Sequence, residues 1–107
     1  MVRWADPERV AAAVAEYAGL LRARNPEVAE IYWYGSWVSG TATPASDVDL
    51  CVVVESDERR PRDRLPDYLP SRFPVAIDLH VLTEEEMAEL PERAPTWHRA
   101  IMSGRRV

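Results

Sequence analysis

Hydrophobic residues follow two different periods along this chain, and each period predicts a different kind of element. Between residues 7 and 24, apolar side chains recur every three or four positions, which is the spacing of one helix face. Asp6 before Pro7 is typical of a helix start, and Asn25 before Pro26 indicates the end of that helix. The predicted buried stripe of this helix consists of Val10, Val14, Tyr17 and Leu21.

Three later segments favour β-strands because they are rich in β-branched and aromatic residues. They cover residues 27–34, 48–54 and 74–82. The second segment is apolar on both faces beyond its first turn, which predicts a central strand with Cys51 buried in it. The third segment has one apolar face and a second face that carries Asp78.

Two further helices are expected after the third strand. Thr83 followed by Glu86 matches a capping box, so we interpret the acidic residues there as helix chemistry and not as catalytic groups. Residues 96–103 predict a last short helix. Pro91 and Pro95 are expected to interrupt the chain between the two helices.

A glycine–serine pair follows the first predicted strand. Gly35 ends that strand, and Ser36 starts a short helix that runs to about Gly40. Backbone N–H groups at such a helix start favour a bound anion, and glycine lets the anion approach the backbone closely. Taken alone, the pair is a weak signal, and a plain turn is the better interpretation of it.

Three aspartates accompany the later strands. Asp47 and Asp49 are one residue apart at the head of the second strand, so their side chains point to the same face. Two carboxylates that close repel each other unless a cation separates them, and a hard ion such as Mg²⁺ suits the pair. Asp78 also needs a partner, either that same metal or an arginine. His80 is either a supporting neighbour or a half-buried strand residue.

The composition excludes several functional classes. The chain has 107 residues, which predicts one domain over residues 1–107, and 47% of them are hydrophobic, as in a packed globule. No apolar run approaches the roughly 20 residues of a membrane helix, and the first six residues lack the apolar core of a secretory signal. The single cysteine, Cys51, excludes an internal disulfide and a Cys-based zinc site. We therefore expect a cytoplasmic protein with no membrane partner.

The charged residues limit which classes of partner and which lysine-based sites are expected. The formal net charge is -5, so nucleic acid is not expected as a partner. All 13 basic residues are arginine, so there is neither a Schiff-base lysine nor a P-loop lysine. The arginine cluster at residues 59–64 is either a solvated segment or an electropositive rim for a triphosphate or an acidic partner.

Gly35-Ser36, ten further residues and Asp47-Val48-Asp49 together resemble the signature of the DNA polymerase beta-like nucleotidyltransferase superfamily. Asp78 follows on a later strand. The short chain is similar to the minimal nucleotidyltransferase (MNT) branch, and residues 100–104 look like the closing helix of that branch. The resemblance implies an α/β fold, in which a small mixed sheet of three or four strands has helices packed on one face.

The resemblance also implies a reaction. A nucleoside triphosphate would lie across Gly35 and Ser36, and its monophosphate would pass to a hydroxyl group, with AMP from ATP as the transferred group. Asp47, Asp49 and Asp78 would hold Mg²⁺, as two ions, and Asp78 would orient or deprotonate the acceptor hydroxyl. Larger relatives carry a second domain that holds the acceptor. Only about 25 residues follow the third strand here, so another molecule is expected to bring the acceptor.

The same resemblance implies a partner. In the minimal branch the usual partner is an all-helical HEPN protein encoded beside it, and the pair acts as toxin and antitoxin. Four tryptophans and four tyrosines also favour an interface, either with such a partner or with a second copy of the chain in a homo-oligomer.

Two positions depart from the family pattern. Many minimal members have arginines where this chain has Trp37 and Ser39, so any phosphate contact from arginine is lost there. Trp37 is expected either to stack on a base or an interface, or to be a partly buried structural residue. These departures favour an alternative, a subunit that masks a toxin without catalysis. A third alternative is a nucleotide sensor that binds the nucleotide without transferring it. Transfer to tRNA or an antibiotic is disfavoured by the acidic charge and the missing acceptor domain.

Overall fold

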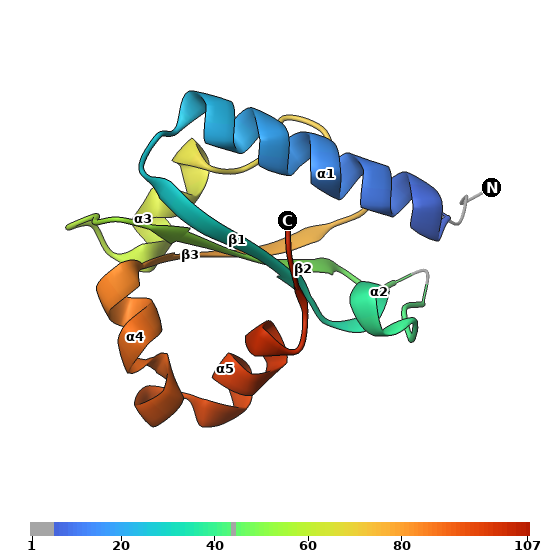
Figure 1. The fold of residues 1–107 in the computed structure, drawn as a ribbon. Coiled ribbons are helices and arrows are strands. Elements are labelled where there is room, and N and C mark those ends of the chain that lie inside the picture. The colour runs from blue at the N-terminus through green and yellow to red at the C-terminus, as the bar shows by residue number, and fades with distance from the viewer. Residues whose placement is uncertain (1–5, 44) are drawn as a thin grey trace.

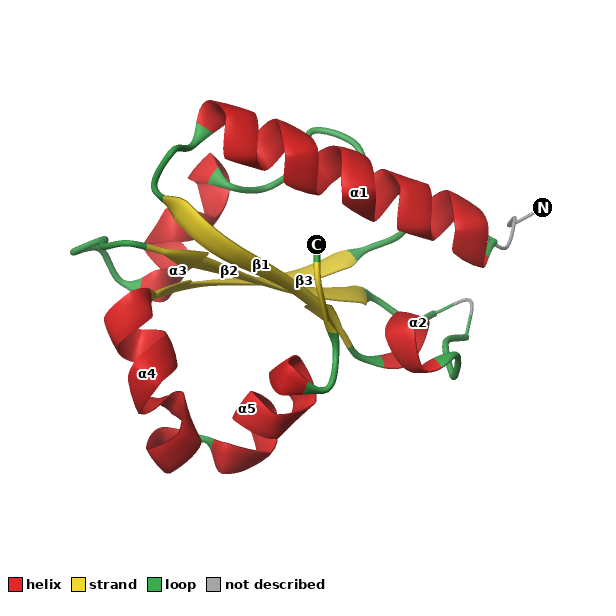
Figure 2. Cartoon of the chain, in the orientation of Figure 1, coloured by secondary structure: helices red, strands yellow, loops and turns green. Residues whose placement is uncertain are grey.

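The computed structural model describes residues 6–43 and 45–107, which form one sheet with helices on both of its faces (Figures 1 and 2). The expectation about a secretory signal falls mainly on residues outside this described part. In chain order the elements are α1 (Pro7–Arg24), β1 (Val28–Tyr34), α2 (Ser36–Ser39), β2 (Val48–Val54), α3 (Pro61–Arg64), the 3-10 turn η1 (Leu65–Asp67), β3 (Ile77–Thr83), α4 (Glu84–Arg93), α5 (Pro95–Met102) and β4 (Arg105–Arg106).

The four strands form a mixed sheet in the order β3-β2-β1-β4. β1 is antiparallel to β2 and to β4, whereas β2 and β3 are parallel. The predicted fold class is confirmed, and β2 is an inner strand as its two apolar faces indicated. The short strand β4 was not predicted, because two residues carry no detectable alternation.

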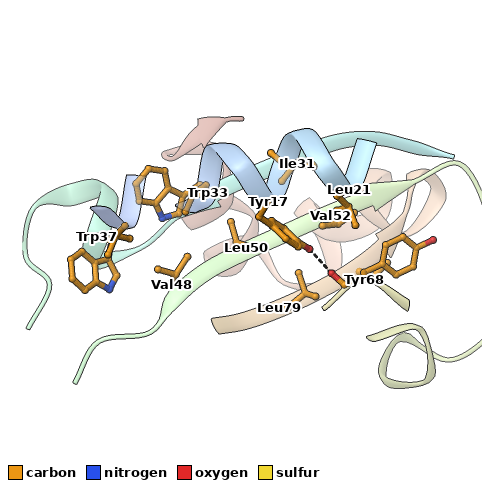
Figure 3. Close-up of a cluster of buried hydrophobic side chains, with 14 of the residues drawn as sticks. Tyr17, Leu21, Ile31, Trp33, Trp37, Val48, Leu50, Val52, Tyr68 and Leu79 are labelled. Carbon is orange, nitrogen blue, oxygen red and sulfur yellow. Dashed lines mark hydrogen bonds between the residues drawn. The ribbon is translucent and has the colours of Figure 1, made fainter. Parts of the chain in front are cut away.

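The residues of β2 point alternately into two hydrophobic cores. We call the cluster under α1 the α1-side core (Figure 3) and the cluster under α4 and α5 the α5-side core. Val48, Leu50, Val52 and Val54 belong to the first, and Cys51 and Val53 to the second. The expectation that helices pack on one face is therefore wrong. An apolar stripe shows that a helix has a buried side, but not which face of the sheet it covers.

Helix α1 follows the sequence prediction closely. The Asp6 side chain accepts a hydrogen bond from the Arg9 backbone N–H at 2.8 Å, and the helix ends before Asn25. The predicted stripe is buried in the α1-side core. From this stripe the Tyr17 hydroxyl donates to the Tyr68 carbonyl at 2.7 Å, which ties α1 to the segment before β3 (Figure 3).

The capping box at α4 is confirmed in both directions. The Glu86 N–H donates to the Thr83 hydroxyl at 3.1 Å, and the Thr83 N–H donates to a Glu86 carboxylate oxygen at 2.8 Å. Pro91 lies inside α4, so the expected interruption there is wrong, and α4 ends instead just before Ala94. In the described part of the chain no helix is both long and apolar enough to cross a membrane.

The aromatic residues that the structure describes serve these cores. The tryptophans and tyrosines among the described residues are buried or half-buried. The exposed large hydrophobic residues in this part of the chain are Leu20, Leu69 and Met102. The surplus of tryptophan and tyrosine in the sequence therefore does not mark an exposed aromatic surface here.

Candidate active site

Two carboxylates face each other at the start of the parallel strands β2 and β3. Asp49 and Asp78 are register partners, and each is the second residue of its strand. Register partners on adjacent strands lie roughly 5 Å apart along the sheet, with their side chains on the same face. The sequence placed these two residues on separate strands, and the fold brings them side by side.

The electrostatics of Asp49 reflect this crowding. Burial raises the pKa of the Asp49 carboxyl, and the charges of Asp78 and Asp47 raise that pKa further. The electrostatic interaction with nearby His80 lowers the Asp49 pKa. In the described residues no arginine forms an ion pair with any of the three aspartates. The mutual repulsion of these carboxylates is the kind that a bound cation relieves.

Gly35 leaves the room in which the Asp49 carboxylate lies. Its φ is +86°, a conformation that favours glycine, and a Cβ there would press on the Asp49 carboxylate, 3.0 Å from its Cγ. Gly35 also carries the backbone from β1 into α2, and its carbonyl accepts from the N–H groups of Val38 and Ser39 at 3.1 Å. The half-buried Ser36 forms no side-chain hydrogen bond within the described residues. The glycine–serine turn thus adjoins the carboxylate pair directly.

Asp47 lies just outside the pair. It is exposed, precedes β2, and acts on Asp49 through its charge. Over residues 6–43 and 45–107, no three His, Cys, Asp or Glu side chains are arranged as they stand to hold a metal ion. The carboxylate oxygens of Asp49 and Asp78 are nevertheless the donor type that Mg²⁺ prefers, with a third carboxylate in electrostatic reach. The three-aspartate metal site therefore stays a prediction.

An aromatic group from α5 borders the carboxylates. The Trp97 Nε1–H donates to the Tyr34 hydroxyl at 3.0 Å, and the Trp97 ring meets His80 edge to face at 4.7 Å between centroids. His80 Nε2 lies 3.4 Å from a carboxylate oxygen of Asp78. Burial raises the pKa of Tyr34 to about 12, with smaller contributions in the same direction from charges that include those of Asp49 and Asp78.

Sequence reasoning missed two members of this group. Tyr34 was placed only as a strand residue, although its position just before Gly35 and opposite Asp49 now puts it at the site. Trp97 falls within the predicted last helix, residues 96–103, and nothing in the sequence pattern indicates which strand it meets. His80 is half-buried in β3, as its interpretation as a strand residue predicted, and its role as a supporting neighbour of Asp78 stays a prediction.

The two departures from the family pattern have structural explanations. Trp37 is 8% exposed in the α1-side core, and its Nε1–H donates to the Ser46 carbonyl at 3.0 Å. Its structural interpretation is therefore correct, and stacking on a base is not. The exposed Ser39 hydroxyl lies 2.9 Å from that of Thr41. Neither residue brings positive charge to the glycine–serine turn.

The arginine cluster at residues 59–64 lies beyond the opposite end of β2. The Arg64 guanidinium is buried and donates to the Val81 carbonyl at 3.0 Å and to a Glu86 carboxylate oxygen at 2.6 Å. Arg59 binds Asp57 and Asp67. These contacts connect α3 to β3 and α4, so Arg59 and Arg64 serve the fold and form no rim around the carboxylate site.

The chain is similar to a known structure in its fold and to a known protein family in its sequence. The fold is similar to the crystal structure of a "putative nucleotidyltransferase" from Sulfolobus solfataricus, with a TM-score of 0.62, 23% sequence identity, and coverage of 78% of this chain and 75% of that one. At that identity the likeness concerns the fold alone. No curated protein matches the chain in sequence.

The sequence model of the nucleotidyltransferase domain matches residues 14–101. This span is most of the chain, and it contains the glycine–serine turn, all three aspartates and the aromatic group from α5. The chain therefore belongs to the nucleotidyltransferase domain family.

Proposed function

We propose that this domain transfers AMP from ATP to a hydroxyl group of a partner protein, with Asp49 and Asp78 at the centre of the reaction. Membership of the family supports nucleotidyl transfer in general. The observation that carries the finer proposal is the Asp49–Asp78 pair, which faces the Gly35 turn and which no arginine of residues 6–43 and 45–107 neutralises.

Each residue has a distinct task in this proposal. Asp47, Asp49 and Asp78 hold Mg²⁺, which supplies charge neutralisation for the triphosphate when it is bound. The Gly35–Ser36 backbone and the Ser36 hydroxyl orient the phosphates. Asp78 is exposed on the outer strand β3, so an acceptor hydroxyl can reach it from solvent.

The reaction is an in-line displacement. The acceptor oxygen forms a bond to the α-phosphorus of ATP while the bond from that phosphorus to the bridging oxygen breaks, so pyrophosphate leaves. The hydroxyl proton passes to the Asp78 carboxylate. His80 lies 3.4 Å from the Asp78 carboxylate and packs against Trp97, which is hydrogen-bonded to Tyr34. These contacts restrict how the Asp78 carboxylate is oriented.

We further propose that the acceptor is a HEPN-type helical protein encoded beside this chain, and that the domain acts as its antitoxin. The support is the resemblance of the short chain, and of residues 100–104, to the minimal branch. The absence of arginine at Trp37 and Ser39 favours a competing proposal, in which the domain masks the toxin by contact and transfers nothing.

The test is to incubate the protein with ATP labelled at the α-phosphate, Mg²⁺ and the neighbouring HEPN-type protein. We expect label on the partner, release of pyrophosphate, and loss of both in Asp49→Asn and Asp78→Asn. Asp63→Asn, at an exposed ion pair in α3, is the matched control. Undiminished labelling in Asp49→Asn would remove the proposed site. Neutralisation of the partner without labelling, unchanged in Asp49→Asn, would establish masking, and ATP binding without pyrophosphate release would indicate a sensor.

A further inference from the structure

A second recessed surface lies on the face of the sheet opposite to Asp49. A groove of about 940 Å³ runs between α1 and the segment of residues 67–74 that leads into β3. Figure 1 shows this segment passing behind α1. The groove belongs to the side of the α1-side core, whereas Asp49 shares its strand face with Cys51 in the α5-side core. It is therefore separate from the carboxylate site.

Exposed apolar surface gathers at this groove. Leu20 from α1 and Leu69 from the facing segment are 49% and 51% exposed, and both line it. Two of the three exposed large hydrophobic residues of the described chain therefore lie here. Ala12 and Ala13 form part of the α1 wall, and their small side chains allow a bound backbone to come close.

The groove is also basic, although the chain as a whole is acidic. Arg9, Arg24 and Arg72 line it, and in the described part of the molecule none of them forms an ion pair. Of the two acidic residues in the lining, Asp67 is already bound to Arg59 at 2.6 Å. The groove therefore offers positive charge with little internal compensation, on a protein with a formal net charge of -5.

We propose that this groove binds an acidic amphipathic helix of a partner protein. Arg9 and Arg24 are separated along α1 by about 22 Å, at roughly 1.5 Å per residue, which corresponds to about four turns of a bound helix. Acidic side chains pair with the arginines on the two walls, and apolar side chains cover Leu20 and Leu69. This docking leaves Asp49 and Asp78 uncovered, so it does not depend on nucleotidyl transfer.

The probe for this proposal is a synthetic fluorescein-labelled helical peptide of about 15 residues, matched to the length of the groove. It carries a leucine stripe at helical spacing and glutamates near both ends, and a second peptide replaces each glutamate with lysine. Fluorescence anisotropy gives the Kd for the whole chain and for Arg24→Glu, Arg72→Glu and Leu20→Asp. Arg62→Glu and Arg99→Glu are matched controls, because both arginines are exposed, form no ion pair with another described residue and lie off the groove.

We expect the glutamate peptide to bind, and each groove variant to raise its Kd by about tenfold, with the controls unchanged. The negative net charge of the protein repels acidic peptides in general, so binding of this peptide requires a local basic site. Three results would overturn the proposal: no binding of the glutamate peptide, an equal Kd for the lysine peptide, or the same increase in Kd in the control variants. Concentration-dependent dimerisation of the chain, abolished by the same groove variants, would overturn it in favour of a second copy. Circular dichroism confirms that each variant is folded.

Discussion

The strand pair β2–β3 has acidic residues near both of its ends, and the two ends treat them in opposite ways. At the start, Asp49 faces Asp78, and no arginine in the described part of the chain pairs with either. Burial is the largest cause that raises the Asp49 pKa, and the charges of Asp78 and Asp47 raise it further. Beyond the far end, hydrogen bonds from Arg59 lower the pKa of Asp57 to about 2. Glu86 lies there too, and bonds that include those from Arg64 lower its pKa even though burial acts against them.

The difference separates carboxylates that stabilise the fold from those that we propose to be functional. At the far end the protein supplies its own cations, so the charges are balanced within the fold and link α3 to α4. At the start no arginine of the described residues pairs with Asp49 or Asp78, and these repelling carboxylates cost stability unless a cation arrives from solution. The pairing of each carboxylate therefore indicates its role more directly than its exposure does.

The largest effect is expected at the far end, where Arg64→Met would leave the Val81 carbonyl and Glu86 without their partner. The loss should be about 2 to 4 kcal/mol in the free energy of unfolding, because a buried arginine leaves several unsatisfied groups behind. Urea unfolding measures this loss. Arg60→Met, which breaks only an exposed ion pair with Asp63, should cost less than about 1 kcal/mol. Equal losses in the two variants would contradict the contrast between the two ends.

At the start of the strands, Mg²⁺ should stabilise the folded protein. At a concentration of about 100 times its Kd, a ligand that binds only the folded state adds about 2.7 kcal/mol, seen as a rise in Tm. Asp49→Asn should abolish this rise, and Glu86→Gln should retain it. If Mg²⁺ raised the Tm of both variants equally, neither Asp49 nor Glu86 would be needed to hold the ion, and the comparison would fail. This measurement needs no acceptor.

A substitution can also give the carboxylates at the start of the strands an arginine partner, like those at the far end. His80 Nε2 lies 3.4 Å from Asp78, so His80→Arg would place a guanidinium beside the carboxylate pair. We expect nucleotidyl transfer to fall by about 10- to 100-fold, because the new ion pair competes with Mg²⁺. His80→Gln introduces no charge and should stay within a few-fold of wild type. Full activity in His80→Arg, measured as label transfer from ATP, would show that the carboxylates do not need a free cation.

The smallest effect is expected in the pH dependence of stability. As pH rises, the stabilising contribution of Glu86 at the far end should grow, whereas that of Asp49 at the start should be lost. The folded-state pKa of Glu86 is lowered, so its contribution is present above the ordinary value of about 4.3 and is lost as pH falls through the folded value. The pKa of Asp49 is raised, so its contribution is present below about 3.9 and is lost as pH rises. Glu86→Gln should therefore reduce acid sensitivity, whereas Asp49→Asn should gain stability relative to wild type as pH rises from 3 to 7. Parallel pH profiles for the two variants would contradict this assignment.

The sequence predicted those features that local patterns determine. The faces of β2 and β3, the Asp6 cap, the Thr83 capping box and the approach of Asp78 to Asp49 all follow from alternation, cap chemistry and the family motif.

The features that it missed depend on contacts between distant segments. The side of the sheet that each helix covers, the bond from Trp97 to Tyr34, and the partners of Arg64 join residues far apart in the chain, so no local period encodes them. Trp37 illustrates the limit, because its environment is fixed by the fold and not by its neighbours in sequence.

The buried Arg64 has one more consequence. β3 is an outer strand, and the backbone groups on such an edge can pair with a strand of another molecule and seed aggregation. By holding the Val81 carbonyl, Arg64 occupies one acceptor on β3 that a foreign strand would otherwise compete for. A side chain that stabilises the fold thereby also protects one position of this sheet edge from pairing with a foreign strand.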